Sequence, residues 1–188
     1  MDEQHELMLV KRFPTIFRDY KGSIYETCMG WGICCGNGWF QLLWKACEEV
    51  EKALDGTGII LVADQVKEKF AGLRFYYHFE NVPETPPLLY WLGKRLDWVT
   101  SKMCRVGQYR LRWWLHRQRR RVFETRMEQA GSAVSRAEEK SYETCEDCGR
   151  PGKRHGGFYI FTSCESCFIK SEIYRLRESL ERWKKHGC

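Results

Sequence analysis

Four cysteines in the last quarter of the chain have the residue type and spacing of a metal site. Cys145, Cys148, Cys164 and Cys167 form a Cys-x2-Cys-x15-Cys-x2-Cys array. Each Cys-x2-Cys pair places two thiolates on one tight turn, and the residues between the pairs suffice for a short hairpin that brings them together tetrahedrally. The spacing therefore predicts a zinc ribbon that binds one zinc ion. A pair of disulfides or a redox-active dithiol is the alternative.

The residues around the two pairs suit a ribbon. Gly149 and Gly152 follow the second cysteine, where a zinc knuckle needs a positive φ. Residues 158–162 are rich in β-forming side chains and are expected to return to the second pair as a strand. Four thiolates fill the coordination shell of zinc, so the site is predicted to stabilise the fold and not to catalyse. His155 is a candidate substitute ligand.

No other part of the sequence indicates an enzyme. There is no phosphate-binding glycine loop followed by Lys and Ser or Thr, no His-Glu-x-x-His and no Gly-x-Ser-x-Gly, and the five histidines stand in separate contexts. A zinc-stabilised nuclease would need a second metal site beside the ribbon, where His155 and Asp147 are the available ligands. We therefore expect no catalytic residues and no small-molecule substrate.

Glycine, cysteine and tryptophan are concentrated between residues 27 and 39. Cys28, Cys34 and Cys35 lie in this loop, and Cys47 follows it. A second metal site is conceivable there. Because no Cys-x2-Cys pair or histidine accompanies these cysteines, the pattern favours buried free thiols.

Hydrophobic periodicity predicts an α+β fold in which the N-terminal unit, residues 1–82, packs a helix on a hairpin. Apolar residues recur every three or four positions in the helices, and strand-length apolar or alternating runs follow them. The elements expected in this unit are helices over 4–12 and 39–54, strands over 58–63 and 73–79, and a polar connection over 64–72.

The rest of the chain is expected to be mostly helical. Over residues 83–140 an apolar stripe, broken at Gly107, predicts two helices over 87–104 and 108–140, or one long kinked helix. Residues 141–188 are expected to form the zinc ribbon and a terminal amphipathic helix. That helix is predicted to pack back on the ribbon or on the long helix.

Positive charge is concentrated in the helical segment. Residues 86–126 contain eleven Lys or Arg against two acids, a balance of +9, so the other residues sum to −3 within the net charge of +6. Guanidinium groups interleaved with flat rings suit contacts to phosphates and bases. The predicted partner-binding residues are Arg110, Arg112, Trp113, Trp114, Arg117, Arg119, Arg120 and Arg121.

The alternative for this segment is a solvated helix whose arginines pair with nearby glutamates. Eight arginines and one acid lie between Arg105 and Arg126, an excess that local pairing cannot neutralise. An acidic partner is therefore predicted, and both nucleic acid and an acidic protein groove fit it. The sequence has no signal peptide or membrane-spanning stretch, so we expect a cytoplasmic protein whose ten cysteines are thiols or metal ligands.

Four segments carry a resemblance to a known family. They are TCMGWG at 27–32, CGNGW at 35–39, QVKEKFAGLRFY at 65–76 and SYETCEDCGRPG at 141–152. These segments resemble a family of small phage and prophage proteins of uncharacterised function, and the resemblance covers residues 7–80 and 137–167. It implies a phage origin and a host-cell cytoplasmic location, and it supplies no catalytic residues.

The phage resemblance suggests a function by analogy with anti-CRISPR inhibitors, which occupy a surface of a host complex. We expect a non-enzymatic binding protein that disables a host-defence nucleoprotein complex by protein contact. The alternative is direct nucleic-acid binding in phage replication or transcription control. The positive net charge disfavours simple DNA mimicry, which needs an acidic surface.

Overall fold

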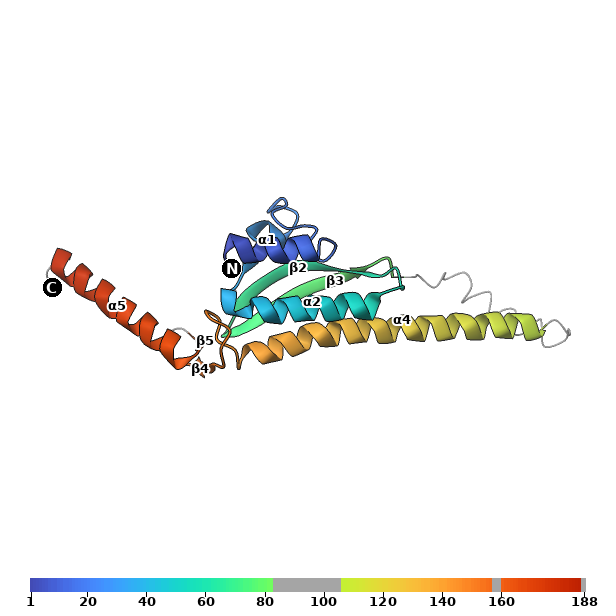
Figure 1. The fold of residues 1–188 in the computed structure, drawn as a ribbon. Coiled ribbons are helices and arrows are strands. Elements are labelled where there is room, and N and C mark those ends of the chain that lie inside the picture. Colours follow the sequence, from blue (N-terminus) through green and yellow to red (C-terminus); the bar gives the residue numbers. More distant parts are fainter. Residues whose placement is uncertain (83–105, 157–159, 187–188) are drawn as a thin grey trace.

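The computed structural model describes residues 1–82, 106–156 and 160–186, and within these the side chains of 106–122 and 185–186 are not described. The fold is α+β, as predicted (Figure 1). None of the described helices is both long and apolar enough to cross a membrane. The elements are α1 (Glu3–Arg12), η1 (Cys28–Trp31), β1 (Ile33–Cys34), η2 (Asn37–Trp39), α2 (Phe40–Leu54), β2 (Ile60–Lys69), β3 (Gly72–Glu80), α4 (Val106–Ser141), β4 (Lys153–His155), β5 (Phe161–Ser163) and α5 (Glu165–His186).

Both helices predicted in the N-terminal unit are present. The side chain of Asp2 accepts a hydrogen bond from the backbone N–H of His5 at 2.9 Å and so caps α1, which ends at Phe13 before a proline. The two helices pack together, with the rings of Phe13 and Trp44 in edge contact at 5.3 Å. The apolar stripe of α2 is buried, as its period of three and four predicts.

The sheet is larger than predicted. β2 and β3 form an antiparallel hairpin, and β1 pairs with β2 in parallel on the other side. The prediction of a polar connection over 64–72 was wrong, because residues 64–69 belong to β2. Val66 of that stretch is buried opposite Phe75, while its polar neighbours lie on the more exposed face. A register shift between Ala63 and Gln65 interrupts the alternation that would have revealed the strand.

The hairpin turns through only two residues, Phe70 and Ala71, which have φ values of 54° and 66°. Positive φ at both central positions is the conformation of a type I′ turn, which asparagine and glycine adopt more easily than bulky residues. Phe70→Asn is therefore expected to raise the free energy of unfolding by about 0.5 kcal/mol, measured by urea denaturation. Phe70→Ala, which keeps the backbone penalty, should bring no such gain.

The long helix α4 supports both the core and the sheet edge. Its second half packs a row of small residues, Ala130, Ala133 and Ala137, into the core beside α2. Two of its side chains also complete the outer edge of β3. Glu138 Oε1 accepts a hydrogen bond from the N–H of Phe75 at 2.8 Å, and Ser141 Oγ accepts one from the N–H of Leu73 at 2.8 Å. This covers N–H groups that an open edge strand would expose.

The first half of α4 extends beyond the body of the protein (Figure 1). Near the end of α2, Arg126 Nη1 still donates to the carbonyl oxygen of Ala53 at 3.2 Å. Residues 106–122 continue the helix away from that contact for about 25 Å. The predicted helix over 108–140 is thus confirmed as α4, whereas the one predicted over 87–104 lies outside the described residues.

The terminal helix α5 is present, but the prediction that it packs back on the molecule was wrong beyond its first turns. Phe168 stacks on the ring of His155 in the ribbon, with centroids 4.2 Å apart. From there α5 projects away from the body (Figure 1). Its amphipathic pattern, which predicted a covered face, leaves that face exposed.

The four cysteines of the N-terminal third divide into two kinds. Cys35 and Cys47 are buried, as predicted, and burial raises the pKa of the Cys35 thiol to about 12. Cys28 and Cys34 are exposed, so for them the prediction of burial was wrong. Cys34 faces solvent because it alternates with buried Ile33 along β1.

Candidate metal centre

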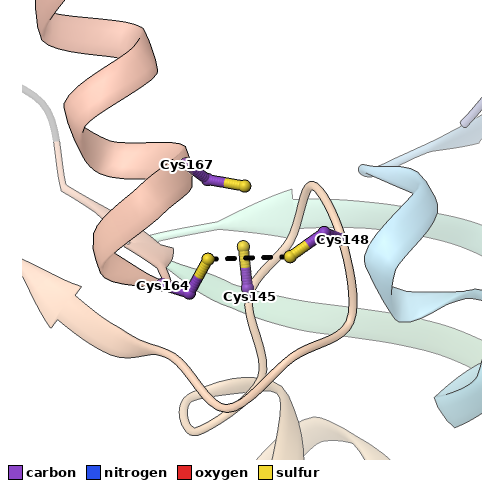
Figure 2. Close-up of side chains that lie close together, drawn as sticks. All are labelled: Cys145, Cys148, Cys164 and Cys167. Atoms are coloured by element: carbon purple, nitrogen blue, oxygen red, sulfur yellow. Dashed lines mark hydrogen bonds between the residues drawn. The ribbon is translucent and has the colours of Figure 1, made fainter.

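The four predicted ligands meet at one point. The Sγ atoms of Cys145, Cys148, Cys164 and Cys167 all lie within 4.8 Å of one another, and their side chains point toward a common centre (Figure 2). The Sγ atoms of Cys148 and Cys164 are 3.6 Å apart. Tetrahedral ligands on zinc, with Zn–S bonds of about 2.3 Å, would be about 3.8 Å apart. The cluster could therefore hold a metal ion.

Cys145 and Cys148 lie on a tight turn directly after α4. The N–H of Gly149 donates to the carbonyl oxygen of Cys145 at 2.9 Å, and the N–H of Cys145 donates to the carbonyl oxygen of Arg150 at 2.8 Å. Gly149 has a φ of 73°, so it takes the left-handed conformation that was predicted for a knuckle glycine. This turn, residues 145–150, is called the knuckle below.

The second pair lies where β5 passes into α5. Cys164 precedes the helix and Cys167 lies in its first turn, three residues later. Residues three apart on a helix share one face, so both thiols point toward the knuckle. The positive end of the helix dipole lies at this terminus and favours negative charge there.

Arg150 provides a positive charge beside the sulfurs. Its Nε donates to Cys148 Sγ at 3.3 Å, and its Nη2 donates to Cys164 Sγ at 3.5 Å and to the hydroxyl of Ser166. A metal with four thiolates carries net negative charge, which the guanidinium partly compensates. Arg150 thus orients and stabilises the cluster from outside.

The four thiols differ in acidity. The hydrogen bond from Arg150 lowers the pKa of Cys148, and the one from Ser166 lowers the pKa of Cys164 to about 6. Burial instead raises the pKa of Cys145, and it raises that of Cys167 to about 12. Binding of a metal would therefore displace protons chiefly from Cys145 and Cys167.

His155 does not join the cluster. Its Nε2 lies 3.2 Å from the carbonyl oxygen of Ser163, and its ring is stacked on Phe168. It supports the junction between the ribbon and α5 and is not a substitute ligand here. Across the described residues, the four cysteines are the one group of three or more potential ligands close enough to share a metal ion.

The knuckle is docked on a loop far away in the sequence. Gly36 N–H donates to Glu146 Oε1 at 2.9 Å, and Gly38 N–H donates to the carbonyl oxygen of Glu146 at 2.7 Å. The indole Nε1 of Trp39 donates to the carbonyl oxygen of Thr144 at 2.9 Å. We call residues 36–39 the docking loop. Its role was not predicted from the sequence, although its Gly-Asn-Gly pattern was a signal of close backbone approach.

The approach is too close for any side chain at the two glycines. A Cβ atom on Gly36 would lie 2.3 Å from the carbonyl oxygen of Glu146, and one on Gly38 would lie 2.1 Å from the carbonyl oxygen of Cys145. The ribbon also holds the hairpin turn, since Thr162 Oγ1 donates to the carbonyl oxygen of Ala71 at 2.7 Å. The segment that carries the cysteine cluster thus contacts two parts of the N-terminal unit.

The predicted partner-binding residues lie elsewhere. Residues 110–121 are in the half of α4 that extends beyond α2, whereas the knuckle follows the opposite end of that helix. A helix of 36 residues is about 54 Å long, so the two regions do not form one site.

Comparisons with known proteins identify no family. The chain matches no protein-family model, and no curated protein or solved structure is significantly similar to it. The resemblance to small phage proteins therefore stays a prediction.

Proposed function

We propose that the metal is zinc and that its role is structural. The four-thiolate cluster supports this, because soft sulfur ligands at tetrahedral spacing suit zinc and leave no open position for a reactive water. Hydrogen bonds from the docking loop to Glu146 and Thr144 join the N-terminal unit to the segment that carries the cysteines. A bound metal would stabilise this contact by fixing the shape of the knuckle. A ribbon of this size buries too little apolar surface to fold without it.

We further propose that the protein is a non-enzymatic, phage-type binding protein that inhibits a host-defence nucleoprotein complex, in the manner of an anti-CRISPR protein, in the host cytoplasm. The observation that carries this proposal is the position of the arginine-rich half of α4. The backbone of residues 106–122 continues α4 beyond the body of the protein (Figure 1).

The charge of this projection favours an acidic partner. Residues 106–122 contain six arginines and no acidic residue, and these six charges equal the net charge of +6 of the whole chain. The remainder is therefore neutral overall. Trp113 and Trp114 lie within the same stretch, and tryptophan and arginine are the residues most enriched at the energetic centres of protein interfaces. An acidic groove on a protein of the host complex would complement this charge, and apolar contacts beside it would receive the tryptophans.

Direct nucleic-acid binding is the second candidate. The run of arginines at 117 and 119–121 has the density of phosphate-binding segments. Salt dependence separates the two candidates. A protein that neutralises about six phosphates loses on the order of 10³-fold in DNA affinity between low and moderate salt, whereas a protein contact rich in aromatic residues changes much less.

Alanine at Arg117, Arg119, Arg120 and Arg121 is expected to weaken capture of the host partner at least tenfold without changing the stability of the fold. The reason is that these positions lie beyond the packed half of α4. The measurement is affinity capture of host nucleoprotein complexes by the immobilised full chain, followed by identification of the retained proteins and titration with the purified complex.

The matched control removes the same charge from other surfaces by alanine at Lys11, Lys45, Lys52 and Arg154, which are all exposed. This variant should bind as the parent does. If both variants lost the same affinity for the host partner, the effect would be due to net charge and not to the position of the arginines on α4. Retention of nucleic acid alone, with a steep salt response, would replace the leading proposal by the second.

A further inference from the structure

One face of α5 exposes five large apolar side chains. Between 46% and 65% of the surface of each is accessible, although such residues are usually buried. The helix α5 projects from the body (Figure 1), and the spacing of these residues places them on one stripe along it. The residues are Ile169, Ile173, Leu176, Leu180 and Trp183. A contiguous apolar stripe on a projecting helix marks an interaction surface.

The spacing of the stripe identifies the kind of surface. Its members are separated by four, three, four and three residues, which is the a/d pattern of a coiled-coil heptad. Ile173 and Leu180 then occupy a positions, and Ile169, Leu176 and Trp183 occupy d positions. With its 22 residues α5 is about 33 Å long and holds about three heptads. The stripe is narrow, as in a two-stranded coiled coil, and not broad as on a helix buried in a core.

The charges beside the stripe are self-complementary. The e positions hold Lys170, Arg177 and Lys184, and the g positions of the first two heptads hold Glu165 and Glu172. In a parallel pair each g residue faces the e residue five positions later on the other helix. This matches Glu165 with Lys170 and Glu172 with Arg177, twice over by symmetry. An antiparallel pair would instead place e positions beside e positions, and lysine and arginine would repel one another.

We propose that α5 of two copies of this protein forms a parallel two-stranded coiled coil, so that the chain is a homodimer. The e and g charges indicate that the partner helix is α5 of a second copy, because a helix with this charge pattern complements itself in parallel register. Glu172 accepts a hydrogen bond from Arg175 on its own helix at 2.8 Å. Its second carboxylate oxygen remains available to Arg177 of the other copy.

The dimer places the two bodies at the same end of the coiled coil. Since α5 begins at the ribbon, the two metal centres lie at the base of the pair and the arginine-rich halves of α4 belong to a two-fold symmetric molecule. A dimer would present two binding segments to a partner. The proposal itself depends only on α5 and holds whatever the partner is.

Sedimentation of the full chain under reducing conditions tests the proposal. Between about 1 and 100 µM the mass is expected to rise from that of the chain, 22.4 kDa, to twice that value. Ile173→Asp places a charge at a central a position and should weaken dimerisation at least a hundredfold. Tyr174→Asp is the matched control, because Tyr174 is also exposed but lies at a b position, off the stripe; this variant should dimerise normally.

Charge reversal tests the parallel register. Glu172→Lys and Arg177→Glu should each weaken the homodimer on the order of tenfold, since each puts like charges at two g–e contacts. An equimolar mixture of the two variants should form a heterodimer of parental affinity. The proposal is overturned by a monomer at about 100 µM, by a dimer that survives Ile173→Asp, or by a mixture that associates no better than its components. A monomer that binds lipid vesicles through this stripe would assign the surface to a membrane instead.

Discussion

Replacing Cys145 with serine is expected to release the metal and to unfold the ribbon. Cys145 is buried at the centre of the cluster and is the first residue of the knuckle. Serine is a poor zinc ligand, so three thiolates would remain around an ion that prefers four. The docking loop would then lose the partner of its hydrogen bonds at Gly36, Gly38 and Trp39.

The loss of stability should be large because binding and folding are coupled. Structural zinc sites contribute about 10–16 kcal/mol of binding free energy in small peptides, part of which offsets the cost of ordering the chain. We expect the free energy of unfolding in the presence of zinc to fall by about 5 kcal/mol, a large fraction of the stability of an ordinary domain. The measurements are elemental analysis, with one zinc per chain in the parent, and denaturant unfolding monitored by tryptophan fluorescence.

Cys28→Ser is the matched control. Cys28 is exposed and lies outside the cluster, so this variant should keep one zinc per chain and the parental unfolding curve. Chelation of the metal from the parent should reproduce the Cys145→Ser phenotype. A metal-free Cys145→Ser protein that unfolds at the same denaturant concentration as the parent would contradict a structural role for the metal.

Gly38→Ala should have the second largest effect, although Gly38 is not a ligand. The added Cβ would lie 2.1 Å from the carbonyl oxygen of Cys145 and 2.4 Å from the backbone nitrogen of Gly149. Both atoms belong to the knuckle backbone, which cannot move aside without displacing Cys145. We expect a loss of about 3 kcal/mol in unfolding free energy and about a tenfold loss in zinc affinity, measured by chelator competition.

Gly156→Ala separates this steric effect from a general effect of glycine substitution. Gly156 lies in the ribbon between the two cysteine pairs, and a Cβ there meets nothing within 4 Å. Its stability and zinc affinity should match those of the parent. Equal behaviour of the two alanine variants would mean that the docking loop and the knuckle are not in close contact in solution.

The four-cysteine cluster could be predicted from sequence because the information is local. Two cysteines with two residues between them form one turn whatever the rest of the chain does, and the spacing between the pairs limits how they meet. The helix α2 was predictable for the same reason, since its apolar period sits within one segment. In the cysteine pairs and in α2, the residues that determine the local structure lie within the segment itself.

The strand pairing needed information that the sequence does not carry locally. Residues 64–69 look like a polar loop because Val66 is their one apolar residue and the register shift between Ala63 and Gln65 hides the alternation. β1 has two residues, too few for any periodic signal. Their strand character comes from their neighbours in space.

The docking loop and the projection of α5 were missed for opposite reasons. Gly36 and Glu146 are 110 residues apart, so no local pattern links them. In α5 the local pattern was read correctly as an apolar stripe, but a stripe does not say whether its partner is in the same chain. The heptad spacing and the e and g charges were present in the sequence. Only the exposure of the stripe indicates that its partner is another chain.

The distance in sequence between the docking loop and the knuckle also sets the order of events during synthesis. The indole of Trp39 is fully buried, and its hydrogen-bond acceptor, the carbonyl oxygen of Thr144, is 105 residues further along the chain. At about 5–20 residues per second, a ribosome needs about 5–20 s to make that stretch. Until then the N-terminal unit has an open loop and an uncovered tryptophan, so its completion waits for the synthesis of the ribbon up to Cys167 and, on the proposed structural role, for zinc.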